Sequence, residues 1–274
     1  MIPRVVGHGE STRTMTITAS RDARGVATVT LRRAAKLNTL NSEALRALVA
    51  AIESVAAEPA LRAVVLRGEG ERAFIGGADI AEMAALDPAA ARGFITLVHE
   101  ACAALRRCPV PVIARLAGWT LGAGLEIAAA ADLRIAATDA RFGMPEVRIG
   151  IPSVVEAALL PGLIGWGRTR RLLLTGETID AARALDWGLV EEVVAPKALD
   201  GAIARVLAEL LAGGPRAIRL QKELIAAWEE LPPEAAIRRG IESFVHAWDT
   251  DEPARMMAAF LEAMRDRKPG SGSR

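Results

Sequence analysis

Two glutamates have the residue type and the position that acid–base chemistry needs. Glu126 lies in segment 121–131, which otherwise consists of glycine and apolar residues, and Glu146 follows in segment 142–146. Burying a carboxylate without a partner costs several kcal/mol, so a glutamate in such surroundings is expected to serve chemistry. Two carboxylates close together titrate at different pH values, so one can act as an acid while the other acts as a base. The pair indicates an enzyme.

Two turns that contain glycine could supply hydrogen-bond donors beside this pair. The first lies in segment 73–80, and the second lies in segment 118–124, which leads into the helix predicted for Glu126. Glycine lets a ligand approach the backbone, and the N–H groups of a first helical turn have no acceptor within the helix. Amides from the two turns could form an oxyanion hole. With two carboxylates nearby, this arrangement predicts chemistry through a thioester enolate, for which a coenzyme A (CoA) thioester is a suitable substrate.

Simpler interpretations stand beside this one. Segment 73–80 could be a tight turn between a strand and a helix, with Asp79 as the helix cap. Segment 118–124 does not match G-x-G-x-x-G, so a dinucleotide site is excluded. His8, His99 and His246 have no nucleophile at a useful spacing, so we expect ordinary surface or partly buried histidines.

The elements that must position these residues alternate between strands and helices in the first part of the chain. Segment 25–31 alternates like a strand, and Asn41 precedes a helix that repeats Leu45, Leu48, Val49 and Ile52 at helical spacing. Two short apolar runs predict buried parallel strands over 63–68 and 110–116, with a long helix over 88–107 between them. This order predicts an α/β fold with repeated βα units.

After about Leu189 the sequence changes to a helical pattern without a convincing strand between the helices. Helices are predicted over 196–212, 215–228, 233–248 and 252–268. We therefore expect four parts: a flexible arm over 1–14, an α/β core over 15–195, a helical region over 196–268 and a disordered tail over 269–274.

The composition excludes several function classes. The 274 residues can bury a large core, built mainly from Ala, Val, Leu and Ile because the chain has only five Trp, five Phe and no Tyr. A net charge of +1 argues against a general nucleic-acid binder. The longest nearly uncharged run, 116–131, is too short to span a bilayer, so no membrane partner is expected. Cys102 and Cys108 lack zinc or disulfide spacing, which indicates reduced thiols in a cytoplasmic protein.

A short basic cluster beside Trp166 remains. Its members are Arg168, Arg170 and Arg171. We interpret the cluster as a helix start on a solvated face, with a phosphate contact or a subunit interface as alternatives.

Five ordered segments resemble the crotonase superfamily (the enoyl-CoA hydratase/isomerase family), and enoyl-CoA hydratases in particular. The segments are AFIGGADI at 73–80, AGWTLGAGLE at 117–126, FGMPE at 142–146, LTGE at 174–177 and ALDWGLV at 184–190. The resemblance extends from about Val26 to Lys268. It implies an α/β spiral of ββα units with a helical C-terminal region. It also implies that the protein hydrates a trans-2-enoyl-CoA to a 3-hydroxyacyl-CoA without a metal or redox cofactor. CoA is part of the substrate and is therefore not counted as a cofactor.

The resemblance also implies roles for individual residues. Gly76 and Ala123 would supply the two amides of the oxyanion hole, Glu126 would be the base that activates water, and Glu146 would be the acid that protonates C2. Residues expected to line the CoA site are Lys36, Leu37, Gly77, Ala78, Asp79 and Ile80. On the terminal helix, Phe260 and Lys268 would help to cover CoA, often across a subunit boundary. A homotrimer or a dimer of trimers is expected.

Two departures from the hydratase pattern bear on these implications. Segment 153–157 replaces a Gly-Gly-Thr-Gln segment, so that Ser153 and Glu156 stand near the expected acyl pocket. Glu156 is either a solvated helix residue or a polar contact to an unusual acyl group. Ala34 and Ala35 stand where a proline is common, which weakens a phosphate contact for Lys36.

Rival functions use the same fold. A Δ3-Δ2-enoyl-CoA isomerase is the closest, although glutamate at both positions favours a hydratase. Acyl-CoA hydrolysis and retro-aldol cleavage are less favoured. A member of the fold that binds CoA or RNA without turnover is the rival of a different class.

Overall fold

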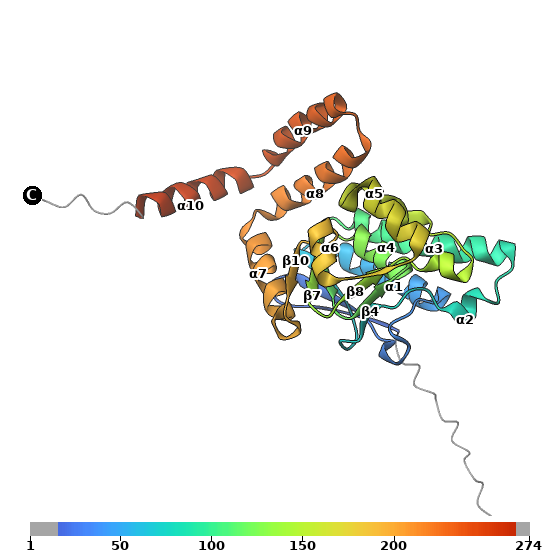
Figure 1. Cartoon of the computed structure of the whole chain (residues 1–274). Helices are drawn as coiled ribbons and strands as arrows, with labels where there is room; N and C mark the ends of the chain where they lie inside the picture. Colours follow the sequence, from blue (N-terminus) through green and yellow to red (C-terminus); the bar gives the residue numbers. More distant parts are fainter. Residues whose placement is uncertain (1–15, 267–274) are drawn as a thin grey trace, which may run out of the picture.

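The computed structural model describes residues 16–266, and Figure 1 shows their arrangement. Two sheets form its centre. The larger sheet has the strand order β1-β2-β3-β5-β7-β10, in which only β1 is antiparallel to its neighbour. Its strands are β1 (Ile17–Arg21), β2 (Val26–Leu31), β3 (Ala63–Gly68), β5 (Val112–Leu116), β7 (Leu133–Ala137) and β10 (Glu192–Val194).

The smaller sheet receives the second strand of three of the repeated units and one further strand. Its order is β4-β6-β8-β9, with β9 antiparallel to β8 and the other pairs parallel. The strands are β4 (Ala73–Ile75), β6 (Trp119–Leu121), β8 (Arg141–Gly143) and β9 (Thr178–Asp180). Because β3-β4, β5-β6 and β7-β8 stack in the same order in both sheets, the carboxyl ends of β4, β6 and β8 meet at one edge. The chain that follows each of these strands therefore reaches a common place.

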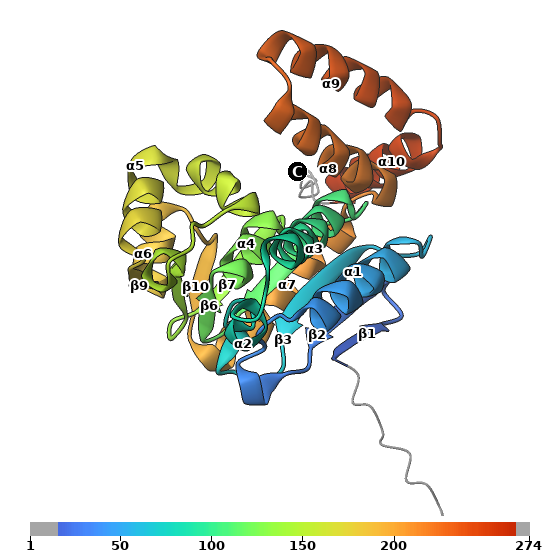
Figure 2. The same ribbon diagram turned by 90° about the vertical axis from the view of Figure 1, so that its right-hand side faces the viewer.

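Four helices belong to these units, and the two long ones cover one face of the larger sheet (Figure 2). The helices are α1 (Ser42–Ala56), α2 (Ile80–Met83), α3 (Pro88–Arg107) and α4 (Ala123–Ala130), and Figure 2 shows α1 and α3 over the sheet. Helix α1 begins where the Asn41 side chain accepts a hydrogen bond from the Ala44 amide at 2.9 Å, and it buries Leu45, Leu48 and Ile52. Helix α4 is buried along its whole length, which explains its lack of amphipathic pattern.

The remaining helices follow the last units. They are α5 (Leu160–Thr175), α6 (Ala181–Trp187), α7 (Leu199–Ala212), α8 (Pro215–Glu230), α9 (Pro233–Ala247) and α10 (Glu252–Asp266). Helix α7 covers the second face of the larger sheet, where Leu199, Ile203 and Leu207 form a separate core cluster. Helices α9 and α10 extend away from the sheets, and neither contains a buried residue.

The α/β fold of ββα units with a helical C-terminal region is confirmed. The strand predicted over 63–68 and the helix predicted over 88–107 coincide with β3 and α3. Predicted helix 196–212 divides into a 3-10 helix, η4 (Pro196–Ala198), and α7. The residue patterns predicted no strand at β1, β4, β6, β7, β8, β9 or β10.

The division into a core over 15–195 and a helical region over 196–268 stays a prediction. The arm 1–14, the tail 269–274 and Lys268 lie outside the described residues. Among residues 16–266, no helix is long and apolar enough to cross a membrane.

Candidate active site

Glu126 and Glu146 line the same cavity, which has a volume of about 670 Å³. The cavity lies where the chain leaves β4, β6 and β8, as the stacking of the repeated units requires. Its other walls are largely apolar. Of the residues predicted for the site, it brings together Gly76, Gly77, Ala78, Ile80, Ala123, Glu126 and Glu146.

Glu126 lies in the first turn of α4 with 4% of its surface exposed. Burial and the charge of Glu146, followed by that of Glu156, raise the pKa of Glu126 from 4.5 to about 8. The backbone groups of Ala157 and Val154 act in the opposite direction by hydrogen bonding to its carboxyl. Burial and the neighbouring charges therefore favour the protonated form of Glu126.

Glu146 begins a 3-10 helix, η2 (Glu146–Ile149), directly after β8 and Pro145. Its Oε2 accepts a hydrogen bond from the Ser153 hydroxyl at 2.8 Å. Its Oε1 occupies the space that a side chain on Gly122 would take, because a Cβ there would lie 2.4 Å from this oxygen. Gly122 also has a φ of +50°, which a larger residue adopts only with strain. These contacts hold the Glu146 carboxyl at the start of α4.

The backbone amides differ in their availability to a ligand. The Gly76 amide donates to the Leu37 carbonyl at 2.8 Å, so the prediction that Gly76 supplies an oxyanion donor is wrong. The Gly76 amide is occupied because segment 37–40 runs beside segment 76–79 and forms backbone hydrogen bonds with it. The carbonyl of Gly77 and the amide of Asp79 both bond to Leu40, at 2.9 Å and 2.7 Å.

The Ala78 amide takes the place of Gly76 as the candidate donor. Because its two neighbours bond to Leu40, the Ala78 N–H points away from that segment. Among residues 16–266 it has no hydrogen-bond acceptor, and Ala78 lines the cavity. Ala123 is the first residue of α4, where an N–H has no acceptor within the helix. Two amides from separate units, those of Ala78 and Ala123, therefore border the cavity that holds both glutamates.

Close backbone packing brings these two amides to one cavity. A Cβ on Gly124 would lie 2.3 Å from the Ile75 carbonyl oxygen, so only glycine lets α4 pack against the end of β4. A Cβ on Gly77 would lie 3.3 Å from the Leu121 carbonyl oxygen.

Three residues predicted for the CoA site do not line the cavity. Asp79 caps α2 by accepting from the Ala81 amide at 3.2 Å, and it forms an ion pair with Arg33 at 3.1 Å. Lys36 is exposed, and its Nζ lies 3.8 Å from the Asp79 carboxylate. The Leu37 carbonyl accepts a hydrogen bond from the Gly76 amide. The simpler interpretation of Asp79 as a helix cap is therefore confirmed.

Phe260 does not contribute to the cavity of its own chain. It lies on α10 with 66% of its surface exposed, and Figure 1 shows that helix far from α2 and α4. The cavity-lining residues include none from α10.

Glu156, in segment 153–157, matches neither of the two roles that the sequence suggested for it. Glu156 is buried rather than solvated, with 7% of its surface exposed, and it does not line the cavity. It lies on a 3-10 helix, η3 (Val155–Leu159), where its Oε1 is 2.7 Å from His99 Nδ1. Sequence reasoning missed this pair, because only the fold brings α3 and η3 together.

The other candidates have structural roles. The three arginines lie within α5 rather than at its start: Arg168 donates to the Trp187 carbonyl at 3.0 Å, Arg170 lies over the ring of Trp166, and Arg171 pairs with Glu177. His246 lies 3.2 Å from Asp249 at the end of α9, and His8 is outside the described residues. Cys102 and Cys108 are buried and free.

The raised pKa of Glu126 predicts a pH-dependent cost to folding. Below pH 4.5 the folded and unfolded chains both hold this proton. Between pH 4.5 and about 8 the unfolded chain releases it first, so the free energy of unfolding falls as the pH rises. Glutamine cannot ionise, so we expect Glu126→Gln to raise the melting temperature at pH 8 by roughly 5 °C and to change it little at pH 5. Thermal unfolding at both pH values measures this, and an equal change at both would contradict it.

Comparison with known proteins gives a consistent result. Residues 21–268 match the family model described as enoyl-CoA hydratase/isomerase. The chain is 35% identical over 246 residues to a short-chain-enoyl-CoA hydratase of Clostridium acetobutylicum, covering 86% of this chain and 91% of that protein. It is 34% identical over 238 residues to a crotonyl-CoA hydratase of Syntrophomonas wolfei, covering 86% and 92%. The crystal structure of an enoyl-CoA hydratase of Mycobacterium smegmatis superposes with a TM-score of 0.88 at 32% identity, covering 91% of this chain and 97% of that one.

Proposed function

The chain belongs to the enoyl-CoA hydratase/isomerase family, and on that premise we propose that it adds water across the C2=C3 double bond of a trans-2-enoyl-CoA to give a 3-hydroxyacyl-CoA. One observation carries the proposal: Glu126 and Glu146 line a single cavity that is also bordered by the amides of Ala78 and Ala123. Hydration needs both features, since a proton must leave water, another must reach C2, and charge must be held on the thioester oxygen.

The two amides would bind the thioester carbonyl oxygen. When the water oxygen bonds to C3, the electron pair of the double bond moves through C2 onto this oxygen and forms an enolate. Donors placed for that charge lower the barrier, and removal of one such donor costs roughly 100- to 1,000-fold in kcat in other enzymes. Ala78 and Ala123 act through their backbone, which explains why small residues suffice at both positions.

The two glutamates would handle the protons. The ionised carboxylate takes a proton from water as its oxygen attacks C3, and the protonated carboxyl gives its proton to C2. Because burial and the charge of Glu146 raise the pKa of Glu126, the pair holds one proton near neutral pH. That single proton supplies one acid and one base.

In our proposal the ligand-free protein holds this proton on Glu126, where burial favours the protonated form. The roles inferred from the family, with Glu126 as base and Glu146 as acid, require the proton to pass to Glu146 before water attacks. A water molecule between the two carboxyls would provide the route. After each turnover the pair again holds one proton, now on the former base.

The lining favours a hydrocarbon acyl chain. Apolar side chains from α2, α3, the connection between them and the segment after β8 surround the glutamates: Met83, Leu86, Phe94, Ile95, Val98, Ile149, Ile151 and Val154. CoA is part of the substrate in this reaction, and the proposed chemistry uses only side chains and backbone amides, without a further cofactor.

Ultraviolet absorbance of crotonyl-CoA tests the proposal, because hydration removes the conjugation between the alkene and the thioester. We expect the absorbance to fall and 3-hydroxybutyryl-CoA to form, at rates that differ among short, long, branched and aromatic enoyl-CoA esters. An isomerase would leave the conjugated ester unchanged. No turnover of any of these esters would contradict the proposal.

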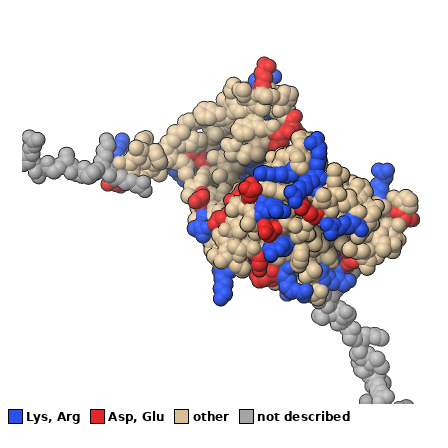
Figure 3. Space-filling model, in the orientation of Figure 1, with Lys and Arg blue, Asp and Glu red and all other residues tan. Residues whose placement is uncertain are grey.

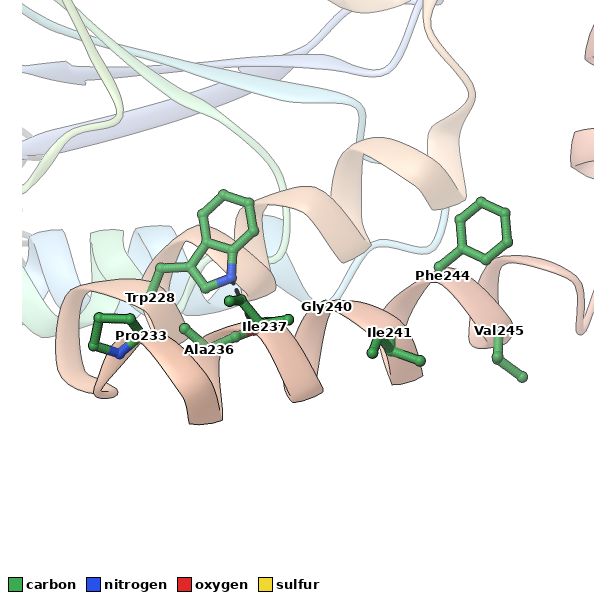
Figure 4. A pocket seen from close by; sticks show the side chains of 8 residues that line it. All are labelled: Trp228, Pro233, Ala236, Ile237, Gly240, Ile241, Phe244 and Val245. Carbon is green, nitrogen blue, oxygen red and sulfur yellow. Dashed lines mark hydrogen bonds between the residues drawn. The ribbon is translucent and has the colours of Figure 1, made fainter.

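We also propose that the protein assembles as a homotrimer or a dimer of trimers through its C-terminal helices. Helices α8 and α9 form an apolar groove, shown in Figure 4, whose lining comprises Trp228, Pro233, Ala236, Ile237, Gly240, Ile241, Phe244 and Val245. Ile237 is 65% exposed and Phe244 is 68% exposed. On the face drawn in Figure 3, charged side chains crowd the core, whereas the helical region shows a largely uncharged surface. An apolar surface of this extent is expected to be covered by protein.

Such an assembly would give α10 a role that it cannot have in a single chain. The α10 of one copy could place Phe260 beside the CoA site of its neighbour, as the family resemblance implies.

Substitution within the groove tests the assembly. We expect Phe244→Asp to convert the protein largely to monomers, because it places a charge in the middle of the apolar surface. Glu242→Ala, on the same helix but outside the groove, is the control and should keep the wild-type mass. Sedimentation equilibrium measures the mass, and a monomeric wild-type protein would contradict the proposal.

A further inference from the structure

A third carboxylate, that of Glu156, is buried outside the cavity that holds the catalytic pair. Its 3-10 helix packs between α3 and α4. The preceding residue, Val155, has a φ of +38°. A β-branched residue in the left-handed region is strained, and such strain persists only where the surrounding structure maintains it. The segment therefore keeps an unfavourable backbone conformation while burying Glu156.

The carboxylate has one well-formed hydrogen bond, to His99, and a weaker side-chain contact with the Cys102 thiol. Its Oε1 lies 2.7 Å from Nδ1 of His99, whose side chain is 56% exposed, whereas the side chain of Glu156 is 8% exposed. Its Oε2 is buried and has no hydrogen-bond partner among residues 16–266. Leaving a buried carboxylate oxygen unsatisfied is costly, so its retention needs an explanation that packing does not give.

The segment around Glu156 contacts both catalytic glutamates. Ser153 donates to Glu146, and the backbones of Val154 and Ala157 hydrogen-bond to Glu126. Segment 153–157 thus holds the two carboxyls of the site and carries a third carboxylate, whose charge acts on Glu126.

The charge of Glu156 acts on its surroundings. It contributes, after burial and Glu146, to the raised pKa of Glu126. Burial and then the charge of Glu156 also raise the pKa of the Cys102 thiol on α3. The titratable and charged groups that face this region are Glu146 on η2, Glu156 on η3, and His99, Cys102 and Arg106 on α3.

We propose that Glu156, anchored by His99, is a positioning residue whose buried negative charge keeps the shared proton of the catalytic pair on Glu126 between turnovers. The inference rests on the proposed hydratase function for its kinetic consequences. It assigns no contact with substrate to Glu156, which acts only through Glu126. Without this charge, Glu126 releases its proton at a lower pH, and the pair then lacks an acid over part of the working range.

Glu156→Gln tests the proposal, because it keeps the shape of the side chain and removes the charge. We expect the alkaline limb of the pH profile of kcat/KM to move to lower pH by about half a unit or more. At pH 8, kcat should fall several-fold while KM changes little. Glu100→Gln, at the exposed neighbour of His99 on α3, is the control and should match the wild-type profile. A merely structural role would lower activity equally at every pH, and a profile that superposes on the wild type would overturn the proposal.

Variants of His99 keep the proposal testable if Glu156→Gln does not fold, because His99 is exposed. We expect His99→Ala to release Glu156 and lower kcat several-fold, whereas His99→Gln, which retains a hydrogen-bond donor, should keep most of the activity. Equal, wild-type activity in both variants would overturn the anchoring role.

Thermal unfolding separates this inference from the proposed function. The fall in melting temperature between pH 5 and pH 8 should be smaller in Glu156→Gln than in the wild type, and Glu156→Gln should have no such effect in the Glu126→Gln background. If the wild type hydrates no enoyl-CoA, the proposed function fails, and these melting curves still decide whether Glu156 controls the proton of Glu126. Unchanged curves would overturn the inference.

Discussion

Replacing Glu126 with glutamine is expected to lower kcat for enoyl-CoA hydration by roughly 1,000-fold or more, with little change in the affinity for CoA esters. Glutamine has nearly the same shape as glutamate, so the cavity remains. It can neither accept a proton from water nor donate one to C2. Steady-state kinetics with crotonyl-CoA give kcat, and a non-hydrolysable CoA thioester in a calorimeter gives the affinity.

Glu146→Gln should have a loss of similar size, since each glutamate depends on the other to complete the proton transfers. The double variant should be little worse than either single one, because residues that act as a unit have non-additive effects. Glu53→Gln, at an exposed position of α1, is the matched control. Wild-type activity in both single variants would contradict the mechanism.

Replacing Gly124 with alanine is expected to lower kcat/KM by roughly 100-fold, although residue 124 has no reactive group. The added methyl group would lie 2.3 Å from the Ile75 carbonyl oxygen, which is backbone and cannot rotate away. The end of β4 and the start of α4 must therefore separate. Ala78 follows β4 and Ala123 begins α4, so their two amides would no longer be spaced for one oxygen.

Gly201→Ala on α7 controls for the general effect of alanine in a helix, since nothing lies within 4 Å of its added methyl group. It should keep wild-type activity. Gly124→Ala should also lower stability by about 1–3 kcal/mol through overpacking. A Gly124→Ala protein that is destabilised but fully active would show that close packing at this position is not needed for catalysis. That result would contradict the role of the amide pair.

The sequence was sufficient to locate the two glutamates and the turns that surround them. Both depend on local features: an unusual charge among apolar residues at Glu126, and glycines at strand ends. Whether the amide of Gly76 or that of Ala78 is available as the oxyanion donor does not depend on the local sequence. It depends on the chain over 37–40, whose pairing with 76–79 occupies the Gly76 amide. A motif within one segment cannot show which of its amides is hydrogen-bonded by another segment.

The same limit applies to Glu156 and His99. Helix α3 and segment 153–157 are far apart in the sequence, and neither residue is near an obvious partner along the chain. Only the packing of η3 between α3 and α4 buries Glu156 and places its Oε1 beside His99. The strands β1 and β10 were missed for a different reason: β1 is mostly exposed, and β10 has three residues, too few for a periodic pattern.

The incorporation of heavy oxygen from water tests the central claim most directly. When crotonyl-CoA reacts in water enriched in oxygen-18, we expect a 3-hydroxybutyryl-CoA that carries the heavy oxygen at C3. Glu126→Gln and Glu146→Gln should each slow its formation by roughly 1,000-fold or more. Consumption of an enoyl-CoA without heavy oxygen in the acyl product, or labelled product formed by both variants at the wild-type rate, would contradict it.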